Sequence, residues 1–189
     1  IVFVYVGRLS FHAKAHPFPM YKALGNASKN IKKGSKIHLI QTGWFPNDYI
    51  KDTFVQDAKT FCPDVTCHFL DGRVEENKMR SLACSDIFIS LSDNFQETFG
   101  ITPLEGMASG MPVIVSDWDG YRDTVRDGID GFSIPTTTLD VNDSKTLIKN
   151  YLHDNLNYDL FTGYASQTVS VDIDICTDRI NKLISDKDL

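Results

Sequence analysis

The sequence predicts an α/β fold in which helices cover both faces of a parallel β-sheet. Short apolar runs rich in β-branched residues alternate with longer amphipathic stretches, which is the order of strand–helix–strand units. Several apolar runs end in turns that contain Gly or Asp, as strands do before a crossover helix. With 189 residues and 42% apolar content, the chain is long enough for one domain with a substantial core.

The first half of the chain is expected to hold three strands, each followed by a helix. A fully apolar run opens the chain, Pro17 marks a helix start, and Asn47 is a typical N-cap. The predicted elements are strand Ile1–Val6, helix Pro17–Lys33, strand Lys36–Thr42, helix Asn47–Ala58, strand Val65–Leu70 and helix Glu75–Cys84.

The second half begins with the most informative stretch, a strand, loop, helix and strand over residues 86–117. Here Thr102 resembles an N-cap, Pro103 stands at the first helical position and Gly110 ends the helix. The predicted elements are strand Asp86–Leu91, helix Thr102–Ser109, strand Met111–Ser116, strand Phe132–Ile134, helix Val141–Leu152, a polar link Asn155–Gly163 and helix Asp172–Ile184. We expect a core of about residues 1–153 and a helical extension of about 154–189.

Composition excludes several classes of function. The net charge of −6 argues against nucleic acid as a partner. The basic residues around Gly34 are expected at a solvated helix end, and they are Lys29, Lys32, Lys33 and Lys36. No apolar run approaches the roughly 20 residues that span a bilayer. The four cysteines lack zinc-ligand spacing, so we expect reduced thiols in a cytoplasmic protein.

The first turn of the chain disfavours a nicotinamide cofactor. A dinucleotide-binding enzyme would carry G-x-G-x-x-G there, whereas the chain has Gly7-Arg8-Leu9-Ser10. His12 and His16 follow without acidic or cysteine partners at metal-ligand spacing. We therefore expect neither a dinucleotide nor a metal in this loop.

Two carboxylates, Glu97 and Glu105, stand eight positions apart around the start of one helix. Helix N-termini at the carboxyl ends of parallel strands bind phosphorylated ligands through free N–H groups. A carboxylate repels phosphate but accepts hydrogen bonds from hydroxyl groups. A ligand with both phosphates and a hydroxyl-rich sugar fits this arrangement.

These residues resemble the E-x7-E motif of retaining glycosyltransferases of the GT-B type, in particular glycosyltransferase family 4, also called group 1. The resemblance is carried by Gly7-Arg8-Leu9, Lys14, Glu97, Phe99-Gly100, the run Glu105–Ile114, Asp127-Gly128 and Asp130-Gly131-Phe132. Gly106 stands where the family usually has Ala. The resemblance covers most of residues 2–135 and implies a doubly wound, Rossmann-like parallel sheet that forms one half of a GT-B architecture.

The resemblance also implies a donor and residue roles. The donor would be a nucleoside diphosphate sugar, used without a metal or other cofactor. The implied catalytic residues are Glu97, which contacts the donor sugar, and Arg8 and Lys14, which neutralise the diphosphate. The implied donor-binding residues are Glu105 at the ribose, the backbone of Phe99, Gly100, Ile101 and Thr102 near the sugar and diphosphate, and Val74 near the nucleobase.

Other interpretations stay open. Thr102 and Glu105 also fit a capping box, in which Glu105 would have no ligand role. Asp117-Trp118-Asp119 is the short D-x-D pattern of metal-dependent transferases. A sugar-nucleotide 2-epimerase shares the expected architecture and donor class, and a non-catalytic nucleotide-binding module needs no acceptor.

The resemblance implies a partner domain. Its members close a cleft between two Rossmann-like domains, and the chain accounts for only the donor-binding half. Because the chain begins within a strand, we expect it to be a portion of a longer protein that lacks the N-terminal acceptor domain. The nucleobase, sugar and acceptor are not fixed by the shared motif, and peripheral membrane contact of the full protein depends on the missing half.

Overall fold

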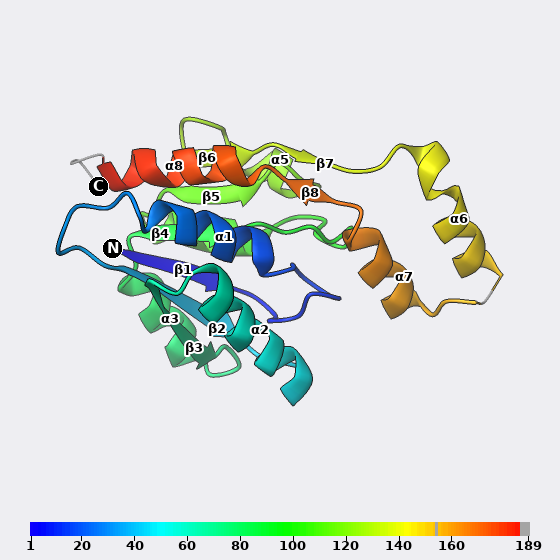
Figure 1. The fold of residues 1–189 in the computed structure, drawn as a ribbon, viewed down its shortest axis with the longest axis horizontal. Coiled ribbons are helices and arrows are strands. Elements are labelled where there is room, and N and C mark those ends of the chain that lie inside the picture. The colour runs from blue at the N-terminus through cyan, green and yellow to red at the C-terminus, as the bar shows by residue number, and fades with distance from the viewer. Residues whose placement is uncertain (154, 186–189) are drawn as a thin grey trace.

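The expected α/β architecture is confirmed in the computed structural model, which describes residues 1–153 and 155–185. Residues 154 and 186–189, part of the expected extension, lie outside the described residues. Six parallel strands form a sheet in the order β3-β2-β1-β4-β5-β6 (Figure 1). They are β1 (Val2–Val6), β2 (Ile37–Gly43), β3 (Val65–Asp71), β4 (Ile87–Ser90), β5 (Val113–Ser116) and β6 (Gly131–Ile134).

Helices cover both faces of this sheet (Figure 1). One face is covered by α1 (Phe18–Ala27), α2 (Asp48–Phe61) and α8 (Ile173–Ser185). The other is covered by α3 (Glu75–Ala83), α4 (Ile101–Ala108) and the single turn α5 (Tyr121–Thr124). Two further helices, α6 (Val141–Leu152) and α7 (Tyr158–Ser166), extend beyond the sheet. Of the helices in the described part of the chain, none has the length and apolar character to cross a bilayer.

Strand β1 shows why the sheet has a core on each side. Successive side chains of a strand point to opposite faces. Phe3 and Tyr5 enter the core under α1, α2 and α8, whereas Val4 and Val6 enter the core under α3 and α4. A central parallel strand is therefore mostly apolar on both faces, as the opening run of the chain is.

The prediction that the first helix continues to Lys33 is wrong. Helix α1 ends at Ala27, and the hydroxyl of Ser28 donates to the carbonyl of Gly25 at 2.8 Å. Such local side-chain bonds compete with helix continuation. The predicted lysines consequently lie in the connection between α1 and β2 instead of at a helix end.

The polar link predicted for residues 155–163 is also wrong, because this segment contains the start of α7. The side chain of Asn157 caps the helix by accepting from the Leu160 N–H at 2.8 Å. After α7, the short strand β8 (Ser170–Val171) pairs antiparallel with β7 (Thr136–Thr137). This pair leads the chain back to the sheet, where α8 packs on α1.

Helix α4 begins two residues earlier than the sequence predicts. Its N-cap is Gly100, in the left-handed conformation with φ of 78°, and not Thr102. Pro103 is therefore the third helical residue, where its missing N–H still costs no hydrogen bond. The predicted end is confirmed. The N–H groups of Gly110 and Met111 donate to Met107 and Gly106 in the pattern of a Schellman motif.

Gly106 is required by the packing of α4 against the sheet. A Cβ atom at this position would lie 2.8 Å from Cβ and Cγ of Phe88. Phe88 is fully buried in β4. The departure from the usual Ala therefore accommodates a large aromatic side chain beneath the helix.

The loops that follow β1 and β4 are fastened to each other. The Ser92 hydroxyl donates to the carbonyl of Lys14 at 3.0 Å, and the Asn94 amide donates to the carbonyl of His12 at 2.9 Å. One carboxylate oxygen of Asp93 accepts from the His16 N–H at 2.9 Å, while its other oxygen is buried without a partner. Burial raises the pKa of the Asp93 carboxyl from 3.8 to about 7.

Replacing Gly106 with Ala should destabilise the protein. Overpacking against Phe88 should cost about 1–3 kcal/mol, which exceeds the gain of roughly 1 kcal/mol from better helix propensity. Urea unfolding of Gly106→Ala measures the net loss. In a Phe88→Leu background the same substitution should cost less, and an equal cost in both backgrounds would show that Phe88 is not the obstacle.

Asp93→Asn should change the pH dependence of stability. A carboxyl whose folded pKa is above its unfolded pKa makes stability fall as pH rises from about 4 to about 7, because the folded state holds the proton longer. The variant has no carboxyl to titrate, so it avoids this loss of unfolding free energy. The loss is at most about 4 kcal/mol, because one pKa unit corresponds to 1.36 kcal/mol. Relative to the wild type, Asp93→Asn should gain stability at pH 8 and not at pH 4. Urea unfolding at both values provides the measurement, and a constant difference would indicate a normal pKa.

Candidate functional site

The candidate site lies where the strand order changes direction. Strands β1 and β4 are neighbours in the sheet, although β2 and β3 separate them in sequence. Their crossover connections run to opposite sides, which opens a crevice at the carboxyl ends of these two strands. The turn with Arg8 and Lys14 follows β1, and the loop with Glu97 follows β4.

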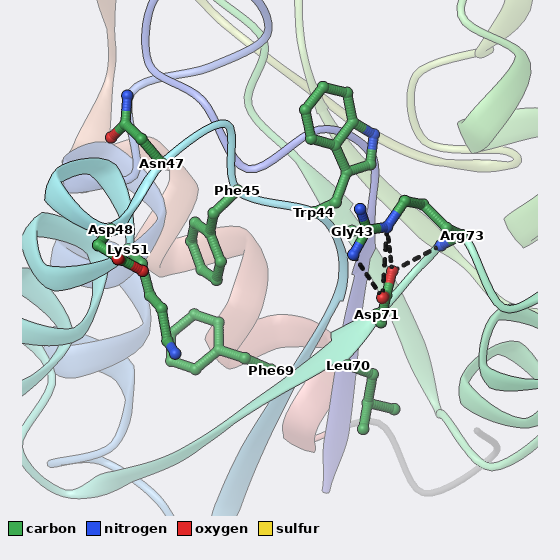
Figure 2. A pocket seen from close by; sticks show the side chains of 10 residues that line it. All are labelled: Gly43, Trp44, Phe45, Asn47, Asp48, Lys51, Phe69, Leu70, Asp71 and Arg73. Atoms are coloured by element: carbon green, nitrogen blue, oxygen red, sulfur yellow. Dashed lines mark hydrogen bonds and ion pairs between the residues drawn. The ribbon is translucent and has the colours of Figure 1, made fainter.

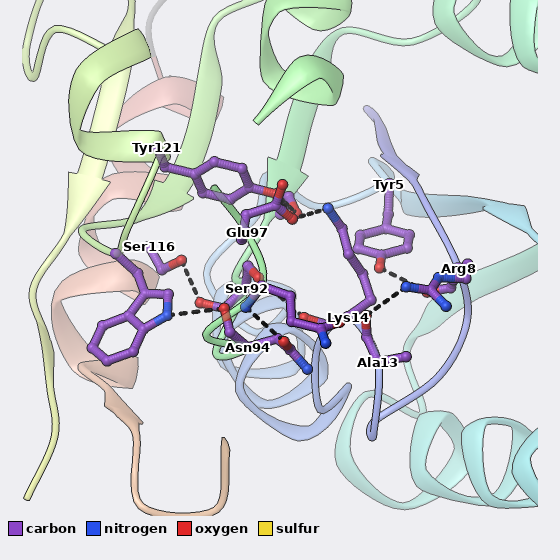
Figure 3. Close-up of polar contacts among 12 residues, drawn as sticks. Tyr5, Arg8, Ala13, Lys14, Ser92, Asn94, Glu97, Ser116 and Tyr121 are labelled. Carbon is purple, nitrogen blue, oxygen red and sulfur yellow. Dashed lines mark hydrogen bonds and ion pairs between the residues drawn. The ribbon is translucent and has the colours of Figure 1, made fainter. Parts of the chain in front are cut away.

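Lys14 and Glu97 meet at this crevice. The Lys14 ammonium forms an ion pair with Oε2 of Glu97, and the two side chains are only 15% and 11% exposed. The hydroxyl of Tyr121 donates to the same oxygen at 3.4 Å and lies 2.8 Å from Oγ of Ser90 (Figure 3). The structure thus brings together two of the predicted catalytic residues and adds a tyrosine to them.

Backbone contacts hold the β4–α4 loop in place beneath Glu97. The Ser116 hydroxyl donates to the carbonyl of Ser92 at 2.6 Å (Figure 3). The indole of Trp118 donates to the carbonyl of Asn94 at 3.2 Å. The N–H of Gly120 donates to the carbonyl of Glu97 at 2.9 Å. These donors come from β5 and the turn after it, so they tie the loop to β5.

Glu105 forms an ion pair with a different lysine from the one that contacts Glu97. Its Oε1 accepts from the ammonium of Lys78, on α3, at 2.7 Å, and both side chains are about 30% exposed. The capping-box alternative for Glu105 is contradicted, because Thr102 is not the N-cap and the carboxylate is turned to α3. A direct contact between Glu105 and Glu97 is not among the interactions of the described residues.

The N-terminus of α4 lies between the two acids along the chain. The N–H groups of Gly100, Ile101 and Thr102 precede the first N–H that donates within the helix, so they have no partner there. Phe99 and Ile101 are 59% and 63% exposed. Gly100 packs on Tyr121, since a Cβ atom there would lie 2.4 Å from Cδ1 of the ring. The predicted backbone donors are therefore at a surface-exposed helix start.

Arg8 is close to this group in the chain but does not contact Glu97. Its guanidinium donates to the carbonyl of Ala13 at 3.3 Å, within the turn that ends at Lys14 (Figure 3). Arg8 also borders a cavity of about 460 Å³, together with Trp44 and Leu160. Arg8 and Lys14 are therefore close in sequence, but Lys14 contacts Glu97 whereas Arg8 lies at the neighbouring cavity.

Val74 lies at the ends of β2 and β3, where it is the half-exposed N-cap residue of α3. A neighbouring cavity of about 320 Å³ is walled by Trp44, Phe45 and Arg73 (Figure 2). Arg73 forms a forked pair with Asp71, with the shortest contact at 2.8 Å. This pair lowers the pKa of the exposed Asp71 carboxyl to about 2.

The D-x-D acids occupy a turn after β5. The Asp117 carboxylate accepts from Arg122 at 3.0 Å, and Asp119 has a positive φ of 43°. Burial, and then the nearby Glu97, raise the pKa of the Asp119 carboxyl. Within the described ranges, His, Cys, Asp and Glu side chains form no cluster of three that could hold a metal ion.

Three residues of this site were missed in the sequence. Ser90 and Tyr121 contact each other beneath Glu97, and Lys78 contacts Glu105. None of them belongs to the short patterns that mark the site, and each is brought there by pairing or packing over a long sequence separation. Only the placement of Lys78 three residues into a predicted helix at a strand end could have indicated a side chain near the crevice.

Comparisons with known proteins identify the family of the chain. The family described as glycosyl transferases group 1 matches residues 1–168. A phosphatidyl-myo-inositol mannosyltransferase of Mycobacterium leprae is 35% identical over 65 residues, which are 34% of this chain and 17% of that protein. The alignment therefore covers only a small part of that mannosyltransferase.

Solved glycosyltransferases share the fold. The structure of Anabaena HepE in complex with UDP-glucose has a TM-score of 0.52 at 21% identity, covering 97% of this chain and 48% of HepE. WaaG, a glycosyltransferase involved in lipopolysaccharide biosynthesis, has a TM-score of 0.61 at 16% identity, covering 99% of this chain and 38% of WaaG. The chain therefore spans about half or less of the proteins whose fold it shares. Since the family match extends over most of the chain, this chain belongs to the group 1 glycosyltransferases.

Proposed function

We propose that this chain binds a nucleoside diphosphate sugar and forms the donor-binding half of a retaining glycosyltransferase. The observation that carries the proposal is the Glu97 carboxylate, held by Lys14 at the switch point of the sheet beside the open N-terminus of α4. An acid next to a cation and free N–H groups suits a ligand that has hydroxyl and phosphate groups together. The UDP-glucose bound by the structural relative HepE belongs to this class of ligand.

The proposed roles follow the charges of the site. Glu97 accepts hydrogen bonds from hydroxyls of the donor sugar, and Glu105 accepts from the ribose. Lys14 supplies a point charge and Arg8 a planar fork for the diphosphate. The N–H groups of residues 99–102 add neutral donors, and the backbone at Val74 adjoins the nucleobase.

These groups also suit the chemistry of transfer. Negative charge builds on the diphosphate as the bond to the anomeric carbon breaks. Preorganised cations and N–H groups stabilise this charge, so the site performs the task with its own residues. We propose metal-independent catalysis for this reason.

The activity of the complete enzyme is proposed to need a second domain. The chain spans 48% of HepE, and a GT-B cleft lies between two halves. We propose that an N-terminal domain of the same protein binds the acceptor, and that this chain alone binds donor without transferring sugar at the rate of a complete enzyme. Free thiols at all four cysteines, which are Cys62, Cys67, Cys84 and Cys176, support a cytoplasmic location.

Calorimetric titration with UDP, GDP and ADP tests the proposal. The wild-type chain should bind one of these nucleotides, and Glu105→Gln should bind it at least about tenfold more weakly. The reason is that a hydrogen bond to a charged acceptor contributes about 1.5–3 kcal/mol, and 1.4 kcal/mol corresponds to tenfold. Asp64→Asn is the control, because Asp64 is exposed just before the amino end of β3.

The outcomes separate the alternatives. Equal affinity in the wild type and Glu105→Gln would remove Glu105 from the site. A wild type that binds none of the three nucleotides would contradict donor binding. Conversion of a sugar nucleotide to its epimer without acceptor would point to the epimerase alternative.

Removing divalent metal should leave nucleotide binding unchanged. Because Arg8 and Lys14 supply the positive charge, the affinity in EDTA should be within about twofold of the affinity in millimolar Mg²⁺. Asp117→Asn should have no effect in either buffer, since its carboxylate is engaged by Arg122. Binding that requires Mg²⁺ and is lost in Asp117→Asn would favour the D-x-D interpretation.

A further inference from the structure

Among the described residues, Tyr121 is the one uncharged side chain that donates a hydrogen bond to the Glu97 carboxylate. It begins α5, is 0% exposed, and directs its hydroxyl toward the β4–α4 loop. The ring is confined by Gly100, whose position leaves no space for a Cβ atom. The hydroxyl therefore has a fixed location between Ser90 and Glu97.

The protons of this group can be assigned from its partners. A tyrosine hydroxyl carries one proton, and it is donated to Oε2 of Glu97 at 3.4 Å. The 2.8 Å contact with Ser90, in which either oxygen can be the donor, is then assigned as a hydrogen bond from the serine to the tyrosine oxygen. Burial, and then the charge of Glu97, raise the pKa of Tyr121, so the hydroxyl stays a donor at neutral pH.

Both protein partners of Glu97 use the same oxygen. Lys14 and Tyr121 lie on Oε2, whereas no hydrogen bond among the residues that the structure describes uses Oε1. The second oxygen is therefore available to a ligand. The orientation of the carboxylate depends on the two groups that fix Oε2.

These two groups differ in how a ligand affects them. Lys14 is cationic, so a diphosphate that enters the crevice competes with Glu97 for its ammonium. Tyr121 is neutral and buried, and a phosphate gains little by displacing it. Once Lys14 turns to the diphosphate, Tyr121 is the partner that remains on Oε2.

We propose that Tyr121 is the positioning residue of Glu97, which keeps Oε1 directed at the donor sugar when Lys14 transfers from Glu97 to the diphosphate. This inference rests on the proposed function. It adds a chain of hydrogen bonds from Ser90 through Tyr121 to Glu97. It also adds a movement of the Lys14 ammonium from Glu97 to the diphosphate. It also predicts that the hydroxyl matters for the sugar and not for the nucleotide.

The test compares two buried tyrosines. Tyr121→Phe removes the hydroxyl on Glu97. Tyr21→Phe removes an equally buried hydroxyl, which donates to Gln41 at 2.9 Å on the other face of the sheet. Affinities for UDP and UDP-glucose, and for GDP and GDP-mannose, are measured by calorimetry for both variants and the wild type.

Tyr121→Phe should bind the sugar nucleotide roughly threefold to tenfold more weakly than the wild type, as expected for one lost hydrogen bond. Its affinity for the free nucleotide should change by less than about twofold. Tyr21→Phe should alter neither affinity. If Tyr121→Phe weakens nucleotide and sugar nucleotide equally, or behaves as Tyr21→Phe does, the positioning role is overturned while the proposed function stands.

A second measurement needs no ligand. In a double-mutant cycle of Tyr121→Phe with Glu97→Gln, the summed shifts of the two single variants in urea midpoint should exceed the shift of the double variant. The cycle of Tyr21→Phe with Glu97→Gln should be additive. Additivity in the first cycle overturns the contact itself. A wild type that binds no nucleotide overturns the proposed function and with it the role toward the sugar, even where the first cycle shows coupling.

Discussion

The ion pair between Lys14 and Glu97 is the contact on which the organisation of the site depends. The two residues are 83 positions apart, and they meet because β1 and β4 are adjacent only in the order β3-β2-β1-β4-β5-β6. Taking two charges largely out of water is costly unless further hydrogen bonds support them. The Tyr121 hydroxyl supplies such a bond to the Glu97 carboxylate. Ser92 and Asn94 fasten the two loops that carry the pair by donating to carbonyls of the other loop.

The sheet could be predicted from the sequence because its strands are marked locally. A central parallel strand is mostly apolar on both sides, and residues 1–6, 87–89 and 113–115 are apolar throughout. The end of α4 was equally readable, because Gly110 is required by the backbone at that point. The family motif could also be recognised from the sequence, because its two acids, Glu97 and Glu105, lie close together in the chain on either side of one helix start.

The sequence did not predict the features that depend on contacts between distant segments. The Thr-Pro pair at residues 102–103 resembles a helix start, yet α4 begins earlier because only a residue without a side chain fits against Tyr121 at position 100. The segment that contains α7 opens with Asn155 and Asn157 and includes Gly163, which are residues typical of a link. Tyr121 carries no local signal, because its acidic partner lies on another element. Lys78, whose partner is Glu105, is indicated only by its position in a helix that follows a strand end.

The two acids of the motif are not equivalent in their surroundings. Glu97 is 11% exposed and has two partners on one oxygen, whereas Glu105 is 29% exposed and has a single lysine. A ligand that pairs with Lys78 would release Glu105 into a partly solvated position, where a lost partner costs little. A ligand that pairs with Lys14 would leave a nearly buried carboxylate, which needs another hydrogen-bond donor at once. In the described part of the chain that donor is present at Glu97, in Tyr121, and not at Glu105. This difference fits the deeper burial of Glu97, which has a neutral partner as well as a charged one.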